Sequence, residues 1–251
     1  IKKYVEKYDA TVFSAPNFAK MLALRMFLIY PSIDPLSNKN RELTEEQINA
    51  VIEKYGIDKK KPIILQVSRF DYLKDPVGVI KAFEMVRRTM PCQLILAGGT
   101  ATDDPESDKV LAEVQEIAKD NPDIHILLLP PDSDIEINAL QRIATVVVQK
   151  SIKEGFGLTV TEALWKGKPV VASAVGGILL QVKNKLTGLL CHSIEGAAYA
   201  IRTLLTNPEY AKWLGKNGHS HVKQNFLITR HLKDYLLLFI SQYYNDELIY
   251  L

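Results

Sequence analysis

Residues 153–173 read KEGFGLTVTEALWKGKPVVAS and contain a loop with two glycines, a helical segment and a short apolar strand. The apolar run TVVVQK, which starts at Thr145, comes just before them, so this part of the chain has the order strand, loop, helix, strand. That order is typical of a βα unit in a parallel sheet. Gly155 and Gly157 favour a loop, because glycine adopts the positive φ angles of tight turns. We therefore expect the helix to start near Thr159.

The same alternation of apolar runs and helical segments extends through residues 62–225. The runs are apolar on both faces, as buried parallel strands are, and the segments between them have helical periodicity. The sequence therefore predicts an α/β fold, a Rossmann-like doubly wound parallel sheet. Besides TVVVQK, the predicted strands are PIILQVS from Pro62, QLILAG from Gln93, IHILLL from Ile124, PVVAS from Pro169 and TGLLC from Thr187.

The two ends of the chain do not fit inside this sheet. We interpret residues 1–61 as the end of a preceding domain followed by a linker. Residues 226–251 are predicted to form a helix rich in Leu and Tyr, which needs an apolar surface to cover it, such as a partner domain. Because the first residue is Ile1, we expect the chain to be a processed or excised fragment.

The composition limits the classes of protein to which the chain can belong. Its 251 residues are 47% apolar and 24% charged, which predicts a soluble globular protein with a full core. Its 31 basic and 29 acidic residues leave a net charge of +2, which argues against a nucleic-acid partner. The longest apolar run, LLLFI, is far shorter than the roughly 20 residues of a membrane span, so none is expected.

The cysteines and histidines predict neither disulfides nor metal sites. Cys92 and Cys191 lie far apart in the apolar runs CQLILA and GLLC, which favours buried free thiols, a reducing compartment and hence a cytoplasmic location. The histidines have no partner at the spacing of metal ligands. We therefore expect no metal and no cofactor.

Two glutamates, Glu154 and Glu162, are eight positions apart in the quoted stretch. In a continuous helix they would lie roughly 12 Å apart along the axis and about 80° apart around it, too far to share a small ligand. With a loop at Gly155 and Gly157, Glu154 instead precedes a helix N-terminus that leaves a strand, where α/β proteins bind ligands. Thr159 and Glu162 also fit a capping box, so helix capping and ligand contact are both open for Glu162.

Two cations follow the first strand of the predicted sheet. Arg69 and Lys74, in VSRFDYLKDP, lie in the loop at the carboxyl end of that strand. This pair suits a diphosphate, with arginine as a bidentate fork and lysine as a point charge. Alternatively, they are surface cations next to a helix start at Asp75. Gly98 and Gly99 follow the next strand and offer close approach of the backbone to a ligand, although two glycines alone are a weak signal.

Taken in order, these features resemble the C-terminal nucleotide-binding domain of retaining glycosyltransferases of family 4, which have two Rossmann-like domains (the GT-B fold). The matching features are the Arg69 and Lys74 pair, the Glu154 and Glu162 pair, the strand GKPVVAS and the VGG that follows it. VSRFDYLKDP, INALQRI and SIKEGFGLTVTEALWKGKPV further resemble the trehalose-forming glycosyltransferring synthases of this family. After Gly177 the chain reads GGILLQV where Gly-x-Pro-Glu is usual in the family.

The resemblance implies a retaining hexosyltransferase that moves glucose from a nucleoside diphosphate glucose to an acceptor sugar, which is glucose in the trehalose-forming group. In that reading Arg69 and Lys74 neutralise the diphosphate. Glu154 faces the donor sugar, and Glu162 accepts the ribose hydroxyls. The other implied donor-binding residues are Phe156, Gly157, Leu158 and Thr159, through their backbone N–H groups, and Gly98 and Gly99.

The resemblance also implies partners. These are the nucleotide-sugar donor, the acceptor sugar and a missing N-terminal domain, onto which the helix of residues 226–251 would pack back. Exposure of that helix would also favour a homo-oligomer. Three other functions remain open: a retaining disaccharide phosphorylase, a non-catalytic nucleotide-binding module, and a glycoside hydrolase that uses Glu154 and Glu162, which would leave the two cations without a role.

Overall fold

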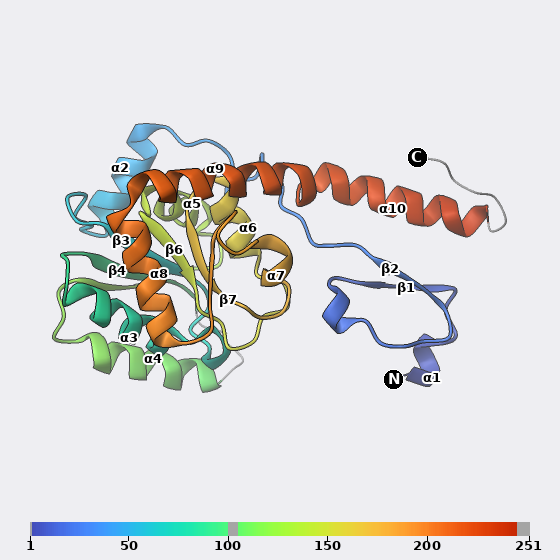
Figure 1. Ribbon diagram of the computed structural model, residues 1–251, viewed down its shortest axis with the longest axis horizontal. Helices are drawn as coiled ribbons and strands as arrows, with labels where there is room; N and C mark the ends of the chain where they lie inside the picture. The colour runs from blue at the N-terminus through green and yellow to red at the C-terminus, as the bar shows by residue number, and fades with distance from the viewer. Residues whose placement is uncertain (1, 100–104, 245–251) are drawn as a thin grey trace.

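A six-stranded parallel sheet forms the centre of the molecule in the computed structural model, which describes residues 2–99 and 105–244 (Figure 1). The strand order is β5-β4-β3-β6-β7-β8, the order of a dinucleotide-binding fold. The predicted doubly wound sheet and its six strands are confirmed. The strands are β3 (Ile63–Val67), β4 (Gln93–Gly98), β5 (Ile124–Leu128), β6 (Val146–Gln149), β7 (Val170–Ser173) and β8 (Leu189–Cys191).

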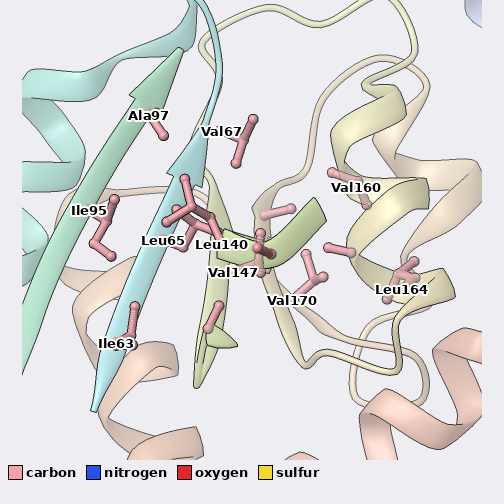
Figure 2. Packing of buried hydrophobic residues seen from close by; sticks show 14 of the residues in the cluster. Ile63, Leu65, Val67, Ile95, Ala97, Leu140, Val147, Val160, Leu164 and Val170 are labelled. Carbon is pink, nitrogen blue, oxygen red and sulfur yellow. The ribbon is translucent and has the colours of Figure 1, made fainter. Parts of the chain in front are cut away.

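The sheet is buried on both faces, which explains why its strands are continuously apolar. Successive side chains of β3 alternate between two cores. Leu65 lies in one core with Leu140 and Leu164 (Figure 2). Ile64 lies in the other with Phe83 and Ile201. The helices that supply these partners are α5 (Asp134–Ile143) and α6 (Leu158–Trp165) on one face and α3 (Pro76–Arg87) and α8 (Ile194–Thr206) on the other.

The remaining helices of this domain pack on the helices that cover the sheet. Pro105 is the first residue of α4, and Pro208 is the first residue of α9. Proline is tolerated at this position because the first backbone N–H of a helix has no acceptor within the helix. The short helix α7 follows the glycines after β7. Their bounds are α4 (Pro105–Ala118), α7 (Ile178–Gln181) and α9 (Pro208–Asn225).

The N-terminal part contains a small separate sheet and a helix of the main domain. The short helix α1 (Lys2–Val5) precedes β1 (Ala10–Phe13), which pairs in parallel with β2 (Arg25–Leu28) across the 3₁₀ turn η1 (Pro16–Phe18). Helix α2 (Glu45–Lys54) begins with a capping box between Thr44 and Gln47. It packs on α5, and its residues Val51 and Ile52 belong to the main core.

The C-terminal helix α10 (Ile228–Tyr243) extends away from the sheet toward β1 and β2 (Figure 1). Arg230 anchors its first turn by donating to the carbonyl oxygens of Tyr30 and Pro31, and Arg25 of β2 donates to Gln242 near its end. The apolar side chains along its other side, among them Leu236 and Phe239, are exposed. None of the helices that the structure describes is long and apolar enough to cross a membrane.

Both cysteines are free and buried, as predicted. Burial raises the pKa of the Cys92 thiol to about 11, and it also raises the pKa of Cys191. At neutral pH, only roughly one Cys92 in ten thousand is then a thiolate, the form that reacts.

We therefore expect the native protein to react very slowly with a disulfide reagent such as DTNB, and to release two equivalents of thionitrobenzoate once guanidinium unfolds it. The absorbance of the released thionitrobenzoate measures the rate of reaction of the native protein and the number of thiols that react after unfolding. Rapid modification of either thiol in the folded protein would contradict this burial.

Candidate active site

A pocket of about 360 Å³ lies where the strand order reverses, between the carboxyl ends of β3 and β6. This is the position at which open α/β sheets bind ligands, because the loops leaving the two strands diverge there. The pocket collects seven of the ten residues that the sequence predicted for the site. Those seven are Arg69, Lys74, Glu154, Phe156, Gly157, Leu158 and Thr159, and Pro31, Val67, Ser68 and Gln149 complete the lining.

The two predicted cations form one wall of this pocket. Lys74 ends the 3₁₀ turn η2 (Tyr72–Lys74), and its Nζ lies 2.7 Å from Glu154 Oε2, in an ion pair whose side chains are 19% and 8% exposed. Arg69 Nη2 lies 3.1 Å from Asp71 Oδ2, and the Arg69 side chain is 60% exposed. Lys74 is thus held by a buried partner, whereas Arg69 is paired with Asp71 and largely exposed to solvent.

The turn that carries Lys74 is itself held from both sides. Asp71 caps it by accepting from the backbone N–H of Leu73. The buried side chain of Gln66 in β3 donates from Nε2 to the Lys74 carbonyl oxygen. Asp75 then caps α3 and forms an ion pair with Lys150, which follows β6. The helix start predicted at Asp75 is confirmed.

A buried chain of hydrogen bonds fixes Glu154 opposite Lys74. Ser151 Oγ donates to Glu154 Oε2 over 3.1 Å, and Gln149 Nε2 donates to Ser151 Oγ over 3.0 Å. Thr159 Oγ1 completes the chain by donating to Gln149 Oε1 over 3.3 Å. Sequence reasoning missed Gln149 and Ser151. The signal was available, because a glutamine at the end of the apolar run TVVVQK needs a buried polar partner.

The loop between β6 and α6 directs the helix N-terminus at the pocket. Residues 154–157 are not helical, so the predicted loop is confirmed, and α6 starts at Leu158, one residue before the predicted start. Gly157 has φ +84° and occupies the N-cap position. The first backbone N–H groups of a helix have no acceptor within it and carry a partial positive charge, so this end of α6 favours an anion.

The capping box considered for Thr159 and Glu162 is not formed. Because the helix starts at Leu158, Thr159 is already its second residue, and its hydroxyl bonds Gln149 instead. Gly157 makes the helix start through its positive φ rather than through a side chain. This frees Glu162 from the local role that its sequence suggested.

Glu162 lies one turn deeper along α6 and does not line the pocket described above. Its side chain is buried, at 6% exposed, and Oε2 accepts a long hydrogen bond of 3.4 Å from Gln141 Nε2 of α5. Burial raises the pKa of Glu162, while the charges of Lys166 and Lys39 act to lower it. Glu162 is therefore a buried carboxyl group with few hydrogen-bond donors around it.

The glycines near the site serve close approaches of the backbone. A Cβ at Gly98 would lie 1.8 Å from the carbonyl oxygen of Ser68, so this glycine lets β4 pack against the loop after β3. Gly98 and Gly99 are not among the residues lining the pocket. A Cβ at Gly176 would lie 1.7 Å from the carbonyl oxygen of Glu154, and Gly177 donates its N–H to the Gly155 carbonyl oxygen over 3.0 Å.

The unusual segment GGILLQV supports the pocket from outside. Its Gln181 is fully buried and donates to the carbonyl oxygen of Phe156, while Thr161 donates to the Gln181 side chain. Leu179 is exposed. In the part of the chain that the structure describes, no group of three His, Cys, Asp or Glu residues could hold a metal ion.

Comparison with known proteins assigns the family. The family model of glycosyl transferases group 1 matches residues 47–221. The chain belongs to this family. The matched range includes both predicted cations, both glutamates and every strand of the main sheet.

The relatives of this group 1 glycosyltransferase chain agree with the predicted resemblance. It is 45% identical over 242 residues to a trehalose synthase of Rubrobacter xylanophilus, covering 94% of this chain and 58% of that protein. It is 35% identical over 175 residues to a trehalose phosphorylase of Grifola frondosa, covering 63% of this chain and 24% of that protein. The chain thus spans less than two thirds of the length of these relatives.

The fold agrees as well. The structure of a sucrose-phosphate synthase from Thermosynechococcus elongatus superposes with a TM-score of 0.80 at 23% identity, covering 98% of this chain and 61% of that chain. The predicted fold, one half of a GT-B glycosyltransferase, is confirmed.

Substitution of Gly176 tests how the two loops of the site support each other. Gly176→Ala places a Cβ against the Glu154 carbonyl oxygen at a φ of +52°. Gly56→Ala is the matched control, because Gly56 has φ +61° with no atom within 4 Å of its Cβ position.

Both variants should lose about 1–2 kcal/mol of unfolding free energy through backbone strain. Gly176→Ala should lose clearly more, since the Glu154 loop has to move. Urea unfolding followed by circular dichroism measures both losses, and equal losses would mean that the close approach is unimportant for stability.

Proposed function

We propose that this chain is the donor-binding half of a retaining hexosyltransferase that moves glucose from a nucleoside diphosphate glucose to glucose, giving trehalose. The observation that carries the proposal is the meeting of Arg69, Lys74, Glu154 and the N-terminus of α6 in one pocket at the reversal of strand order. The similarity to a trehalose synthase over 94% of the chain supports the choice of sugars.

The diphosphate of the donor binds the two cations and the end of α6. Arg69 is 60% exposed, and its guanidinium, which pairs with Asp71 through Nη2, can form a bidentate pair with phosphate oxygens. Lys74 adds a point charge from a fixed position, and the free N–H groups around Leu158 add the favourable end of the helix dipole. Together they stabilise the negative charge that grows on the diphosphate as it leaves.

The donor sugar lies against Glu154. Glu154 Oε2 is shared between Lys74 and Ser151, while no group in residues 2–99 and 105–244 donates a hydrogen bond to Oε1. Oε1 is therefore free to accept a hydroxyl of the sugar. Backbone N–H groups from Phe156 to Thr159 bind further sugar and phosphate oxygens.

The ribose hydroxyls of the nucleotide bind Glu162. An ionised carboxylate has room for about four hydrogen bonds, whereas among the residues that the structure describes only Gln141 donates to Glu162, over 3.4 Å. Two hydroxyl donors would compensate its burial, because a buried charge is costly unless it is hydrogen-bonded.

Transfer proceeds by heterolysis of the bond between the anomeric carbon and the diphosphate oxygen. The electron pair leaves with the diphosphate, and positive charge develops on the sugar ring in an oxocarbenium-like state. The acceptor hydroxyl attacks from the face that the diphosphate leaves and gives its proton to the diphosphate. The configuration at the anomeric carbon is therefore retained. No step uses a metal ion.

The acceptor is proposed to bind mainly to a further domain of the enzyme, onto which the exposed side of α10 packs. This is supported by the relatives, which are longer than this chain.

A disaccharide phosphorylase is the second candidate, supported by the similarity to a trehalose phosphorylase. The same cations would then bind inorganic phosphate and the phosphate of glucose 1-phosphate.

Calorimetric titration of this chain tests the donor site. We expect one of ADP, UDP or GDP, or its glucose conjugate, to bind. Arg69→Ala and Lys74→Ala should each weaken that binding by about 10- to 150-fold, the loss of about 1.5–3 kcal/mol for one charge-assisted hydrogen bond. Lys81→Ala, an exposed lysine on α3 outside the pocket, is the matched control and should bind normally.

Unchanged affinity in both pocket variants would contradict the assignment. Saturable binding of glucose 1-phosphate without any response to nucleotides would favour the phosphorylase.

The chain should bind donor but transfer glucose slowly by itself, because acceptor binding is proposed to need a further domain. Chromatographic detection of trehalose formed from nucleoside diphosphate glucose and glucose measures the rate. A trehalose synthase such as the Rubrobacter xylanophilus relative, assayed in a parallel mixture, is the positive control. Turnover by the chain at a rate similar to that of this relative would show that no further domain is needed.

A further inference from the structure

Gln181, the last residue of the short helix α7, is a polar side chain in an apolar segment. It belongs to GGILLQV, and its neighbours along the chain are Leu180 and Val182. The Gln181 side chain is fully buried. A buried amide is costly unless its hydrogen bonds are made, so the partners of Gln181 indicate its role.

The amide of Gln181 is held in one orientation by three partners. Its Oε1 accepts a hydrogen bond from the hydroxyl of Thr161 in α6. Its Nε2 donates to the carbonyl oxygen of Phe156 and, over 3.4 Å, to that of Gly177. An exchange of the amide oxygen and nitrogen would place an acceptor against two carbonyl oxygens, so the partners determine the assignment. Gln181 therefore ties α7 to both α6 and the loop that precedes α6.

The backbone around Gln181 is fixed as well. His221 of α9 donates from Nε2 to the Leu180 carbonyl oxygen over 3.0 Å, and its Nδ1 accepts from Asn225 Nδ2 over 3.1 Å. The hydroxyl of Thr187 donates to the Gln181 carbonyl oxygen over 3.2 Å. The amide of Gln181 is therefore carried by a backbone that neighbouring side chains hold in place.

The bond from Gln181 sets the direction of the peptide group between Phe156 and Gly157. In a trans peptide the C=O and the N–H point in opposite directions, and none of the described residues has a cis peptide. Because the Phe156 carbonyl oxygen points at Gln181, the N–H of Gly157 points to the opposite side of the loop. Phe156 and Gly157 line the pocket, whereas no residue from 176 to 181 does. The N–H of Gly157 is therefore directed at the pocket.

The preceding peptide group is held in the same way. Gly177 donates its N–H to the Gly155 carbonyl oxygen over 3.0 Å, which directs the N–H of Phe156 away from Gly177. A Cβ at Gly177 would lie 2.7 Å from that oxygen, so this backbone lies directly against the loop. Within residues 2–99 and 105–244, the N–H groups of Phe156, Gly157 and Leu158 have no acceptor. Residues 176–181 thus direct unpaired donors at the pocket.

We propose that Gln181 is a positioning residue of the donor site, whose amide directs the N–H of Gly157 at the β-phosphate of the nucleotide sugar. This inference rests on the proposed function, in which Glu154 faces the donor sugar and the N-terminus of α6 binds the diphosphate. Gly157 lies between these two in the chain, and the β-phosphate lies between the sugar and the rest of the nucleotide. Gln181 itself does not touch the ligand.

Calorimetric titration of Gln181→Met tests this role, with the nucleoside diphosphate that binds best and the monophosphate of the same base. Methionine keeps the length of the side chain but cannot donate to Phe156, so the peptide is free to turn. Affinity for the diphosphate should fall by about tenfold, the loss of one hydrogen bond to a charged oxygen. Affinity for the monophosphate, which lacks the β-phosphate, should stay at the native value.

Gln93→Met is the matched control. Gln93 is also a buried glutamine whose Nε2 donates to two backbone carbonyl oxygens, those of Asp58 and Lys61, but it lies at the amino end of β4, away from the pocket. Both variants should unfold at a lower urea concentration than the native chain, and only Gln181→Met should bind the diphosphate more weakly. Equal losses of diphosphate affinity in the two variants would overturn the specific role of Gln181.

Nuclear magnetic resonance of the ¹⁵N-labelled chain reports on the peptide itself. Saturation with the diphosphate should move the Gly157 amide proton downfield in the native chain, because a hydrogen bond to a phosphate oxygen deshields the proton. In Gln181→Met this movement should be much smaller at saturation. A Gly157 amide signal that does not move in the native chain would overturn the proposal.

The outcomes separate this inference from the proposed function. Native affinity of Gln181→Met for the diphosphate overturns the role of Gln181 and leaves nucleotide binding intact. Absence of nucleotide binding by the native chain overturns the proposed function itself. If circular dichroism shows that Gln181→Met is unfolded, Thr161→Val replaces it, because it removes the hydroxyl that orients the amide. Thr161→Val should bind the diphosphate more weakly and Thr161→Ser, which keeps the hydroxyl, should not; equal binding by the two overturns the proposal.

Discussion

The buried ion pair between Lys74 and Glu154 is the interaction on which the site depends. It joins the loop after β3 to the loop after β6, and so it spans the point where the strand order reverses. Such a pair is costly to desolvate and stable only when further hydrogen bonds satisfy both groups. Ser151 supplies one to Glu154, and Gln66 fixes the backbone that carries Lys74. The charges that face the pocket are therefore held in place by the protein itself.

The backbone around this pair is equally constrained. Gly176 and Gly98 allow neighbouring loops to approach more closely than any side chain would permit. Gly157 lets α6 begin with its N-terminus at the pocket, without a capping side chain that would compete with an anion. This arrangement gives the pocket a wall made of loops that are held close to one another.

Glu154 and Glu162 have different environments and therefore different hydrogen-bond and charge partners. Glu154 is paired with a lysine at 2.7 Å and lines the pocket. Glu162 lies deeper, where it accepts a bond from Gln141 of α5 and where burial raises its pKa.

The sequence by itself determined the elements of the fold and the main residues of the pocket. Strands apolar on both faces and helical periodicity are local signals, and the carboxyl ends of parallel strands necessarily meet at one edge of the sheet, which brings Arg69, Lys74 and Glu154 together. Only the tertiary structure decided which polar groups pair. Lys74 and Glu154 are 80 residues apart, and Lys166 and Asn40 are 126 apart. It also decided that Thr159 bonds Gln149 instead of capping α6, and that Gly98 accommodates Ser68. Such contacts depend on strand register and on the packing of separate loops, which no local pattern contains.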